Sequence, residues 1–242
     1  MKRRFKASLV LALGATDLVL DMRYNGGGEQ TISAELAYMI AGPSRTAGKT
    51  FEKHEFNDKY PNTDPISGKP NTPVPFYSTG QSLSVPSSQP LPHLDLDRVF
   101  VLTSPLTCSA SEGVINGLLG VDVNVILIGT RTCGKPYGFD PQDNCGWTYF
   151  SIQVRAVNQK GYGDYTDGFV PGGGGPAGPL GCLVSPDDTA HDLGDPAETR
   201  VAAALAYRNN ATCPPATARS PDFPAEPTPT RNLFHQNRIV RR

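Results

Sequence analysis

The most restrictive feature of the sequence is a strand–helix–strand pattern between residues 98 and 129. Residues 98–103 form a short apolar run typical of a buried strand, and residues 123–129 form a second one. Residues 111–119, between them, have the pattern of a helix. Two strands joined by a helix within about thirty residues form a βαβ unit, in which the strands are parallel. The sequence therefore predicts an α/β protein with an at least partly parallel sheet.

An earlier segment begins in the same way. Residues 17–22 are a compact apolar run, residues 23–28 are Arg-Tyr-Asn-Gly-Gly-Gly, and residues 31–40 have helical spacing. This order predicts a strand, a glycine turn and a helix. A further strand is expected at residues 149–155 and a late, alanine-rich helix at residues 198–207.

The sequence is expected to form one domain with an insertion and a tail. Prolines recur between residues 43 and 97, where they would interrupt any long element, so this stretch is predicted to be a long Pro-rich, loop-rich insertion. Residues 1–207 are expected to form the core that carries it. Residues 208–242, rich in Pro, Ala and Thr, are predicted to be a flexible tail.

The first fifteen residues fit two interpretations. A basic start followed by a short apolar run resembles a signal peptide. The same residues, from 5 to 13, fit equally well as a helix that leads across a glycine into the first strand.

The charge balance excludes two classes of partner. The chain has 22 Lys and Arg against 23 Asp and Glu, a net charge of −1, so neither nucleic acid nor an anionic membrane is expected as an electrostatic partner. No apolar run approaches the roughly 18 residues that a membrane-spanning helix needs. Nothing in the sequence specifies the oligomeric state.

The five cysteines leave two interpretations open. None has the spacing of a zinc site, so no metal site is expected. They are either scattered free thiols, as in the cytosol, or disulfides formed in an oxidising envelope compartment. The second interpretation pairs Cys133 with Cys145 and Cys182 with Cys213, and it leaves Cys108 free.

A serine stands where the second buried strand meets its helix. In the simpler interpretation, Ser109 caps the helix and Glu112 reaches back to it. In the other, Ser109 is a nucleophile, because the N–H groups at a helix N-terminus stabilise an oxyanion. Such a serine needs a base, and Lys135 follows the next strand, at the same edge of the sheet. A lysine that loses its hydration can accept the serine proton.

The glycine turn also has two interpretations. Glycines at the end of a strand usually supply the positive φ angles of a tight turn. Alternatively, backbone N–H groups in that turn face the nucleophile and complete an oxyanion hole.

Together, the segment from residue 17 to Gly28, the motif Cys-Ser-Ala-Ser-Glu and the pair Gly134-Lys135 resemble the C-terminal processing (tail-specific) peptidases. The resemblance extends over residues 17 to about 155 and implies a crotonase-like α/β core with a Ser/Lys dyad. Ser109 would be the nucleophile and Lys135 the base, with Gly27 and Ala110 supplying the oxyanion-hole N–H groups. The resemblance implies a serine endopeptidase that needs no cofactor and cleaves unfolded or C-terminally exposed polypeptides, in the periplasm or outside the cell.

The chain departs from the family pattern in two respects. Many members carry Gln or Glu four residues after the lysine, where this chain has Phe139, so Asp140, Gln142 or a backbone carbonyl is expected to orient Lys135. Members also usually have a PDZ domain and opening core strands before the first motif, where this chain has about sixteen residues. This predicts a truncated member without a PDZ domain. A catalytically incompetent homologue that binds a peptide or a partner is therefore the alternative.

Overall fold

The fold is built on a four-stranded parallel sheet. In the computed structural model its order is β1 (Val19–Asp21), β4 (Arg98–Thr103), β5 (Asn124–Gly129) and β10 (Leu180–Leu183), and all three pairings are parallel. The predicted α/β class and the βαβ unit are confirmed. The residues described are 14–65, 67–83, 85–139, 141–173, 178–184, 188–214 and 240–241.

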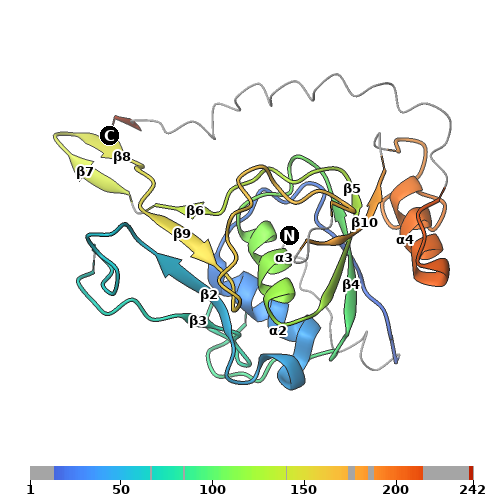
Figure 1. The fold of residues 1–242 in the computed structure, drawn as a ribbon, viewed down its shortest axis with the longest axis horizontal. Coiled ribbons are helices and arrows are strands. Elements are labelled where there is room, and N and C mark those ends of the chain that lie inside the picture. The colour runs from blue at the N-terminus through green and yellow to red at the C-terminus, as the bar shows by residue number, and fades with distance from the viewer. Residues whose placement is uncertain are drawn as a thin grey trace.

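Helices cover both faces of this sheet (Figure 1). Helices α2 (Gln30–Thr46) and α3 (Ala110–Gly120) lie on one face, and α4 (Thr199–Asn210) lies on the other. Because successive side chains of a strand point to opposite faces, β4 contributes side chains to the packing on both faces of the sheet. Val99 and Val101 pack towards α2 and α3, whereas Phe100 packs towards α4.

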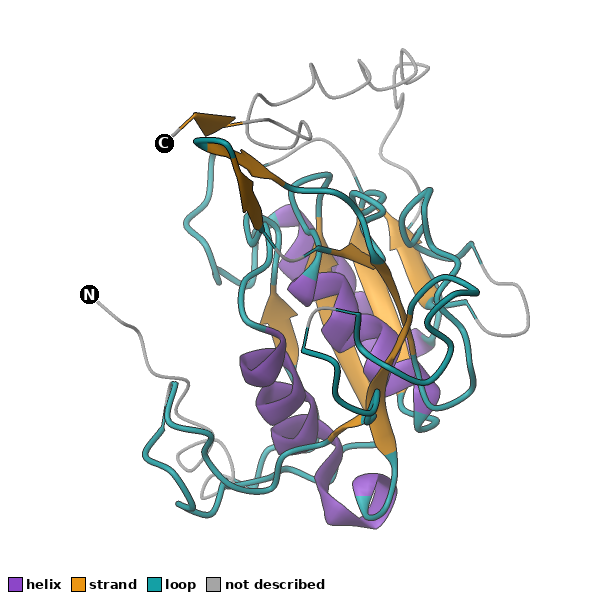
Figure 2. Cartoon of the chain, turned by 90° about the vertical axis from the view of Figure 1, so that its left-hand side faces the viewer, coloured by secondary structure: helices purple, strands orange, loops and turns teal. Residues whose placement is uncertain are grey.

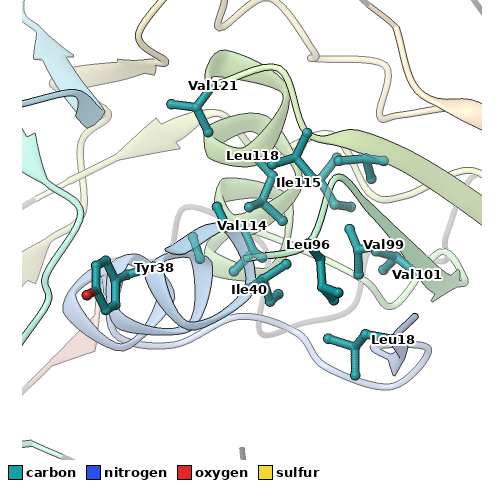
Figure 3. Close-up of a cluster of buried hydrophobic side chains, with 14 of the residues drawn as sticks. Leu18, Tyr38, Ile40, Leu96, Val99, Val101, Val114, Ile115, Leu118 and Val121 are labelled. Atoms are coloured by element: carbon teal, nitrogen blue, oxygen red, sulfur yellow. The ribbon is translucent and has the colours of Figure 1, made fainter. Parts of the chain in front are cut away.

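The larger of the two apolar clusters fills the space between the sheet and helices α2 and α3 (Figure 3). Burying one such side chain contributes about 1.5–3 kcal/mol, so this layer fixes the position of α3 and of the serine before it. Its labelled members are Leu18, Tyr38, Ile40, Leu96, Val99, Val101, Val114, Ile115, Leu118 and Val121.

Helix α2 is longer than the helix predicted at residues 31–40. It passes through Pro43 and kinks at Gly42, whose φ of 67° is unfavourable for any other residue. A side chain on Gly42 would also collide with Asp95.

A second, antiparallel sheet lies beside the core and has the order β3-β2-β9-β6. The stretch predicted to be a loop-rich insertion supplies β2 (Thr50–Glu55) and β3 (Val74–Pro75). Strands β9 (Val154–Val157) and β6 (Tyr137–Gly138) come from the segments after Lys135. The chain that carries the predicted base therefore leads directly into this sheet.

The single strand expected at residues 149–155 is wrong. Residues 150–153 belong to no strand, and they separate β8 (Trp147–Tyr149) from β9. Strand β8 forms a hairpin with β7 (Gln142–Asn144), and β11 (Val240–Arg241) pairs with β8 (Figure 2).

Two sequence predictions fall mainly outside the described residues. The possible signal peptide or helix at residues 5–13 lies outside them, as does most of the predicted tail. Among the described helices, none combines the length and the apolar character that crossing a bilayer requires.

Candidate active site

Ser109 has an unusual backbone conformation for a residue with a side chain. It lies between β4 and α3 with φ 57° and ψ −116°, and it is half-buried. A non-glycine residue at such angles costs of order 1–3 kcal/mol and persists only where its surroundings hold it. Backbone strain at a serine on a strand-to-helix turn is typical of a nucleophile elbow.

The glycine turn packs directly against Ser109. A Cβ atom placed on Gly27 would lie 2.7 Å from the Ser109 Cβ, 2.9 Å from the Cys108 carbonyl oxygen and 3.1 Å from the Ala110 nitrogen. Gly27 also has φ 109°, a conformation that favours glycine. The structure therefore brings three of the predicted site residues, Gly27, Ser109 and Ala110, into contact.

Hydrogen bonds fasten the turn to the serine loop. The Asn25 carbonyl accepts hydrogen bonds from the Cys108 N–H at 3.1 Å and from the Ser111 hydroxyl at 3.0 Å. The Thr107 hydroxyl donates to the Met22 carbonyl at 2.8 Å. These bonds tie the ends of β1 and β4 together and hold the Ser109 conformation.

The two predicted oxyanion donors differ in their present partners. The Gly27 N–H donates to the Asn25 side-chain oxygen at 3.0 Å. The Ala110 N–H is at the start of α3 and has no partner among the described residues. The Ala110 N–H is therefore available to an acceptor, whereas the Gly27 N–H is already engaged by Asn25.

Glu112 connects the serine to the lysine segment. Its carboxylate is fully buried and accepts hydrogen bonds from the backbone N–H groups of Ser109 at 3.0 Å and Lys135 at 2.8 Å. It also accepts the Thr132 hydroxyl at 2.6 Å and the Gly134 N–H at 2.8 Å. The sequence suggested Glu112 only as a helix-capping residue, because Ser-x-x-Glu is local whereas the lysine segment arrives from beyond the next strand.

The Lys135 side chain is half-buried and points to an aromatic ring. Its Nζ atom lies 5.2 Å from the centre of the Phe139 ring, within the range of a cation–π contact. No hydrogen bond joins Nζ to Ser109 among the described residues. Asp140, expected as a possible orienting group, lies outside those residues, and Gln142 is exposed on β7. Phe139, which stands four residues after Lys135 in place of a Gln or Glu, therefore contacts the lysine through its ring.

The expected Cys133–Cys145 disulfide is wrong. Cys133 is bonded to Cys108, the residue expected to be free, and Cys145 is free and exposed. The reason is topological, since Cys108 and Cys133 both follow the carboxyl ends of neighbouring parallel strands, and their Cα atoms are 5.1 Å apart. The second expected pair, Cys182 with Cys213, is joined in the structure and links β10 to the chain after α4.

A buried arginine anchors the first motif to the opposite layer. Arg23 is 1% exposed and binds Asp21 at 2.7 Å and Glu198 at 2.9 Å, and the Glu198 side chain accepts the Val201 N–H at the start of α4. Burial opposes ionisation of Asp21, but its hydrogen bonds with Arg23 outweigh this and lower the pKa of the carboxyl group. No local sequence pattern pointed to Arg23 and Glu198, because they are 175 residues apart.

One cluster of described residues has the composition of a metal site. The sulfur atoms of Cys108 and Cys133 and a Glu112 carboxylate oxygen lie within 4.8 Å of one another. Because the two sulfurs form a disulfide, they offer no thiolate to a metal ion.

The chain matches one family model and resembles several solved structures. The model of peptidase family S41 matches residues 2–143, which include Gly27, Ser109 and Lys135. No curated protein sequence matches the chain. Among solved structures, a Bacteroides fragilis protein assigned to the S41 proteases has 25% sequence identity and a TM-score of 0.63. That alignment covers 84% of this chain and 47% of the other, so the chain spans about half of that relative.

Two further solved structures are less similar. A photosystem II D1 C-terminal processing protease has 18% identity and a TM-score of 0.46, over 73% of this chain and 37% of its own. A lipoprotein from Streptococcus agalactiae has 17% identity and a TM-score of 0.46, over 68% of this chain and 52% of its own.

Proposed function

The chain belongs to peptidase family S41, as the sequence resemblance predicted, and from this premise we propose that it is a serine endopeptidase with Ser109 as nucleophile and Lys135 as general base. The observation that carries the proposal is the contact of Gly27 with Ser109 and Ala110. It places a strained serine, a helix N-terminus and a glycine turn around one point in space, which is the arrangement that acyl transfer requires.

In the proposed reaction, the neutral Lys135 amine takes the proton of the Ser109 hydroxyl while the serine oxygen attacks the carbonyl carbon of the peptide bond. The N–H groups of Gly27 and Ala110 stabilise the negative oxygen of the tetrahedral intermediate. Lys135 then returns the proton to the departing amine, and an acyl-enzyme remains on Ser109. Water, activated by the same lysine, releases the acid and restores the serine.

This reaction requires two local movements from the present arrangement. The Lys135 amine must leave the Phe139 ring for the Ser109 hydroxyl, and the Gly27 N–H must exchange Asn25 for the substrate oxygen. Hydrogen bonds of a catalytic site are often long before the substrate binds and tighten in the complex.

The substrate and location follow from the same premise. We propose an unfolded or C-terminally exposed polypeptide as substrate. Two disulfides among the described residues favour an oxidising location such as the cell envelope. Nucleic acid is not proposed as a partner, because the net charge is −1.

The test compares two serines at the same helix end. Ser109→Ala should abolish cleavage of an unfolded protein substrate. Ser111→Ala should retain much of it, because it loses one hydrogen bond to the Asn25 carbonyl while the bond from the Cys108 N–H remains. Circular dichroism of both variants checks the fold, since loss of the helix cap costs about 0.5–2 kcal/mol. Near-normal turnover by Ser109→Ala would overturn the choice of nucleophile.

A second candidate function is peptide or partner binding without cleavage. The engagement of the Gly27 N–H by Asn25 and the position of the Lys135 amine on Phe139 favour it. In that case an unfolded polypeptide would bind equally well to the wild-type chain and to Ser109→Ala, and neither would cleave it.

A further inference from the structure

The Cys108–Cys133 disulfide joins the two segments that carry the proposed dyad. Cys108 immediately precedes Ser109, and Cys133 lies two residues before Lys135. The bond therefore sets how far these two segments can separate.

The other links between these segments are hydrogen bonds. The Cys133 N–H donates to the Thr107 carbonyl at 3.0 Å, and the Glu112 carboxylate accepts the N–H groups of Gly134 and Lys135, each at 2.8 Å. Because these bonds do not depend on the sulfur atoms, we expect the fold to survive without the disulfide. The lysine segment would then be held by hydrogen bonds that can open individually.

Ser109 is especially dependent on its neighbours. Its φ of 57° is unfavourable and is maintained by the residues on either side. Cys108 is fixed by the disulfide and by two backbone hydrogen bonds: its N–H donates to the Asn25 carbonyl, and its carbonyl accepts the Ser111 N–H, each at 3.1 Å. Opening the disulfide removes the one covalent constraint among these on the residue directly before the proposed nucleophile.

The two sulfur-bearing residues differ in exposure. Cys108 is buried, with 2% of its surface exposed, whereas Cys133 is exposed. A dithiol reductant can therefore reach the Cys133 sulfur. A thiolate of the reductant attacks the Cys133 sulfur and forms a mixed disulfide with it. Cys108 leaves as a thiolate that takes up a proton. The second thiol of the reductant then releases Cys133, so two electrons pass to the protein and the reductant becomes a cyclic disulfide.

We infer that the Cys108–Cys133 disulfide positions Ser109 and Lys135 for catalysis, and that a dithiol which opens it lowers turnover. The inference rests on the proposed function of those two residues. Cys108 and Cys133 are positioning residues, since they act through their neighbours. Misplacement of reacting groups by about 1 Å can lower a rate by about 10²-fold, so we expect kcat to fall about tenfold or more with little change in KM.

The second disulfide provides a matched control. Cys182–Cys213 likewise has one buried and one exposed cysteine, but it links β10 to the chain after α4. The double variant Cys108→Ala/Cys133→Ala should therefore lose kcat and be insensitive to dithiothreitol. The double variant Cys182→Ala/Cys213→Ala should keep the wild-type kcat and lose it when dithiothreitol is added.

The experiment measures kcat and KM on an unfolded protein substrate, with EDTA present so that the thiols freed beside Glu112 cannot capture a metal ion. Peptide mapping identifies which disulfide is open, and circular dichroism shows that each sample is folded. Reoxidation of the dithiothreitol-treated wild-type chain with glutathione disulfide should restore kcat, which a general loss of structure would not predict.

The outcomes separate this inference from the proposed function. If Ser109→Ala is inactive while the reduced chain and Cys108→Ala/Cys133→Ala retain the full kcat, the positioning role is wrong and the proposed function stands. If Ser109→Ala retains turnover, the proposed function fails, and this inference fails with it.

Discussion

Gly27 and Ser109 are 82 residues apart in the chain, yet they lie so close together that no side chain fits between them. A Cβ atom on Gly27 would lie 2.7 Å from the Ser109 Cβ, closer than such atoms can approach. The contact joins the end of the first strand of the sheet to the start of α3, and it makes Gly27 a position where both the backbone angle and the available space require glycine.

This contact predicts that Gly27→Ala inactivates the protein. The new methyl group must displace Ser109 or the turn, and the displaced turn cannot offer its N–H group to an oxyanion. Loss of one oxyanion-hole donor costs about 10²–10³-fold in kcat, which a peptidase assay would measure. Gly26→Ala is the matched control, because a Cβ atom there meets nothing within 4 Å. Equal activity of the two variants would contradict the assignment of Gly27.

Glu112→Gln tests the connection between serine and lysine segments. Each Glu112 oxygen accepts two hydrogen bonds. An amide nitrogen in place of Oε2 would face two N–H donors, and in place of Oε1 it would face the Gly134 N–H and force the Thr132 hydroxyl to reorient. A buried donor left without a partner costs about 1–3 kcal/mol, so we expect the free energy of unfolding to fall by at least about 2 kcal/mol. Activity should fall as well, because both segments lose their common support.

Urea denaturation measures the change, and Glu29→Gln is the control. Glu29 is exposed before α2, and its side chain makes no capping hydrogen bond, so this variant should have wild-type stability. Wild-type stability of Glu112→Gln would mean that the carboxylate charge is not what holds the lysine segment.

The parts of the fold that the sequence predicted best are those whose signals are local. Strand β4 was expected at residues 98–103 and lies there, and α3 differs by one residue at each end. Apolar runs of the right length, a serine before the helix and a short connection all favoured the same structure. Strands β2 and β9 could not be predicted in this way, because Glu55 and Arg155 pair across 100 residues and both strands are partly exposed.

The same difference between local and distant signals explains why the pairing of Cys133 was predicted wrongly. Linear spacing favoured Cys133 with Cys145, which share one loop. The structure pairs Cys133 with Cys108 because β4 and β5 are neighbours and parallel, so the segments after them meet at one edge of the sheet. The predicted βαβ unit contained this information, but using it required combining the topology with the cysteine positions.

The hydrogen bonds of Asp17 should make the free energy of unfolding depend on pH. Its carboxylate accepts hydrogen bonds from Arg98 at 2.7 Å and Arg208 at 2.8 Å, which link the segment before β1 to β4 and α4. Burial opposes ionisation, but these hydrogen bonds outweigh it and lower the pKa of Asp17 below its usual value of 3.8. Asp17 therefore binds a proton more tightly in the unfolded chain than in the folded one. The resulting stability is present above about pH 4 and is lost as the pH falls through the lower pKa of the folded state.

The measurement compares Asp17→Asn with the wild-type chain. The variant should be less stable at pH 7, and the difference should shrink as the pH falls below 4. Asp58→Asn, at an exposed position after β2, should show no such convergence. A difference between Asp17→Asn and wild type that stays constant down to pH 2 would contradict the ion-pair explanation.

Lys135→Ala removes the side-chain amine of the proposed base and keeps the backbone contact that holds residue 135 in place. The hydrogen bond that fastens residue 135 to Glu112 comes from the backbone N–H, which alanine retains. We therefore expect the free energy of unfolding to change by no more than about 0.5 kcal/mol. Loss of a general base lowers the rate by about 10²–10⁴-fold, and the peptidase assay should show this loss. Lys53→Ala, at an exposed position on β2, should have wild-type activity and stability.

The pH profile of the same variants identifies the base. With Lys135 as base, the activity of the wild-type chain should lack the inflection near pH 6.5 that a histidine produces. Lys135→His should either introduce such an inflection or abolish activity. An inflection near pH 6.5 in the wild-type chain, with activity retained in Lys135→Ala, would assign the proton transfer to a histidine. His54, on β2 beside Glu52 and Gln30, would then be the first to replace.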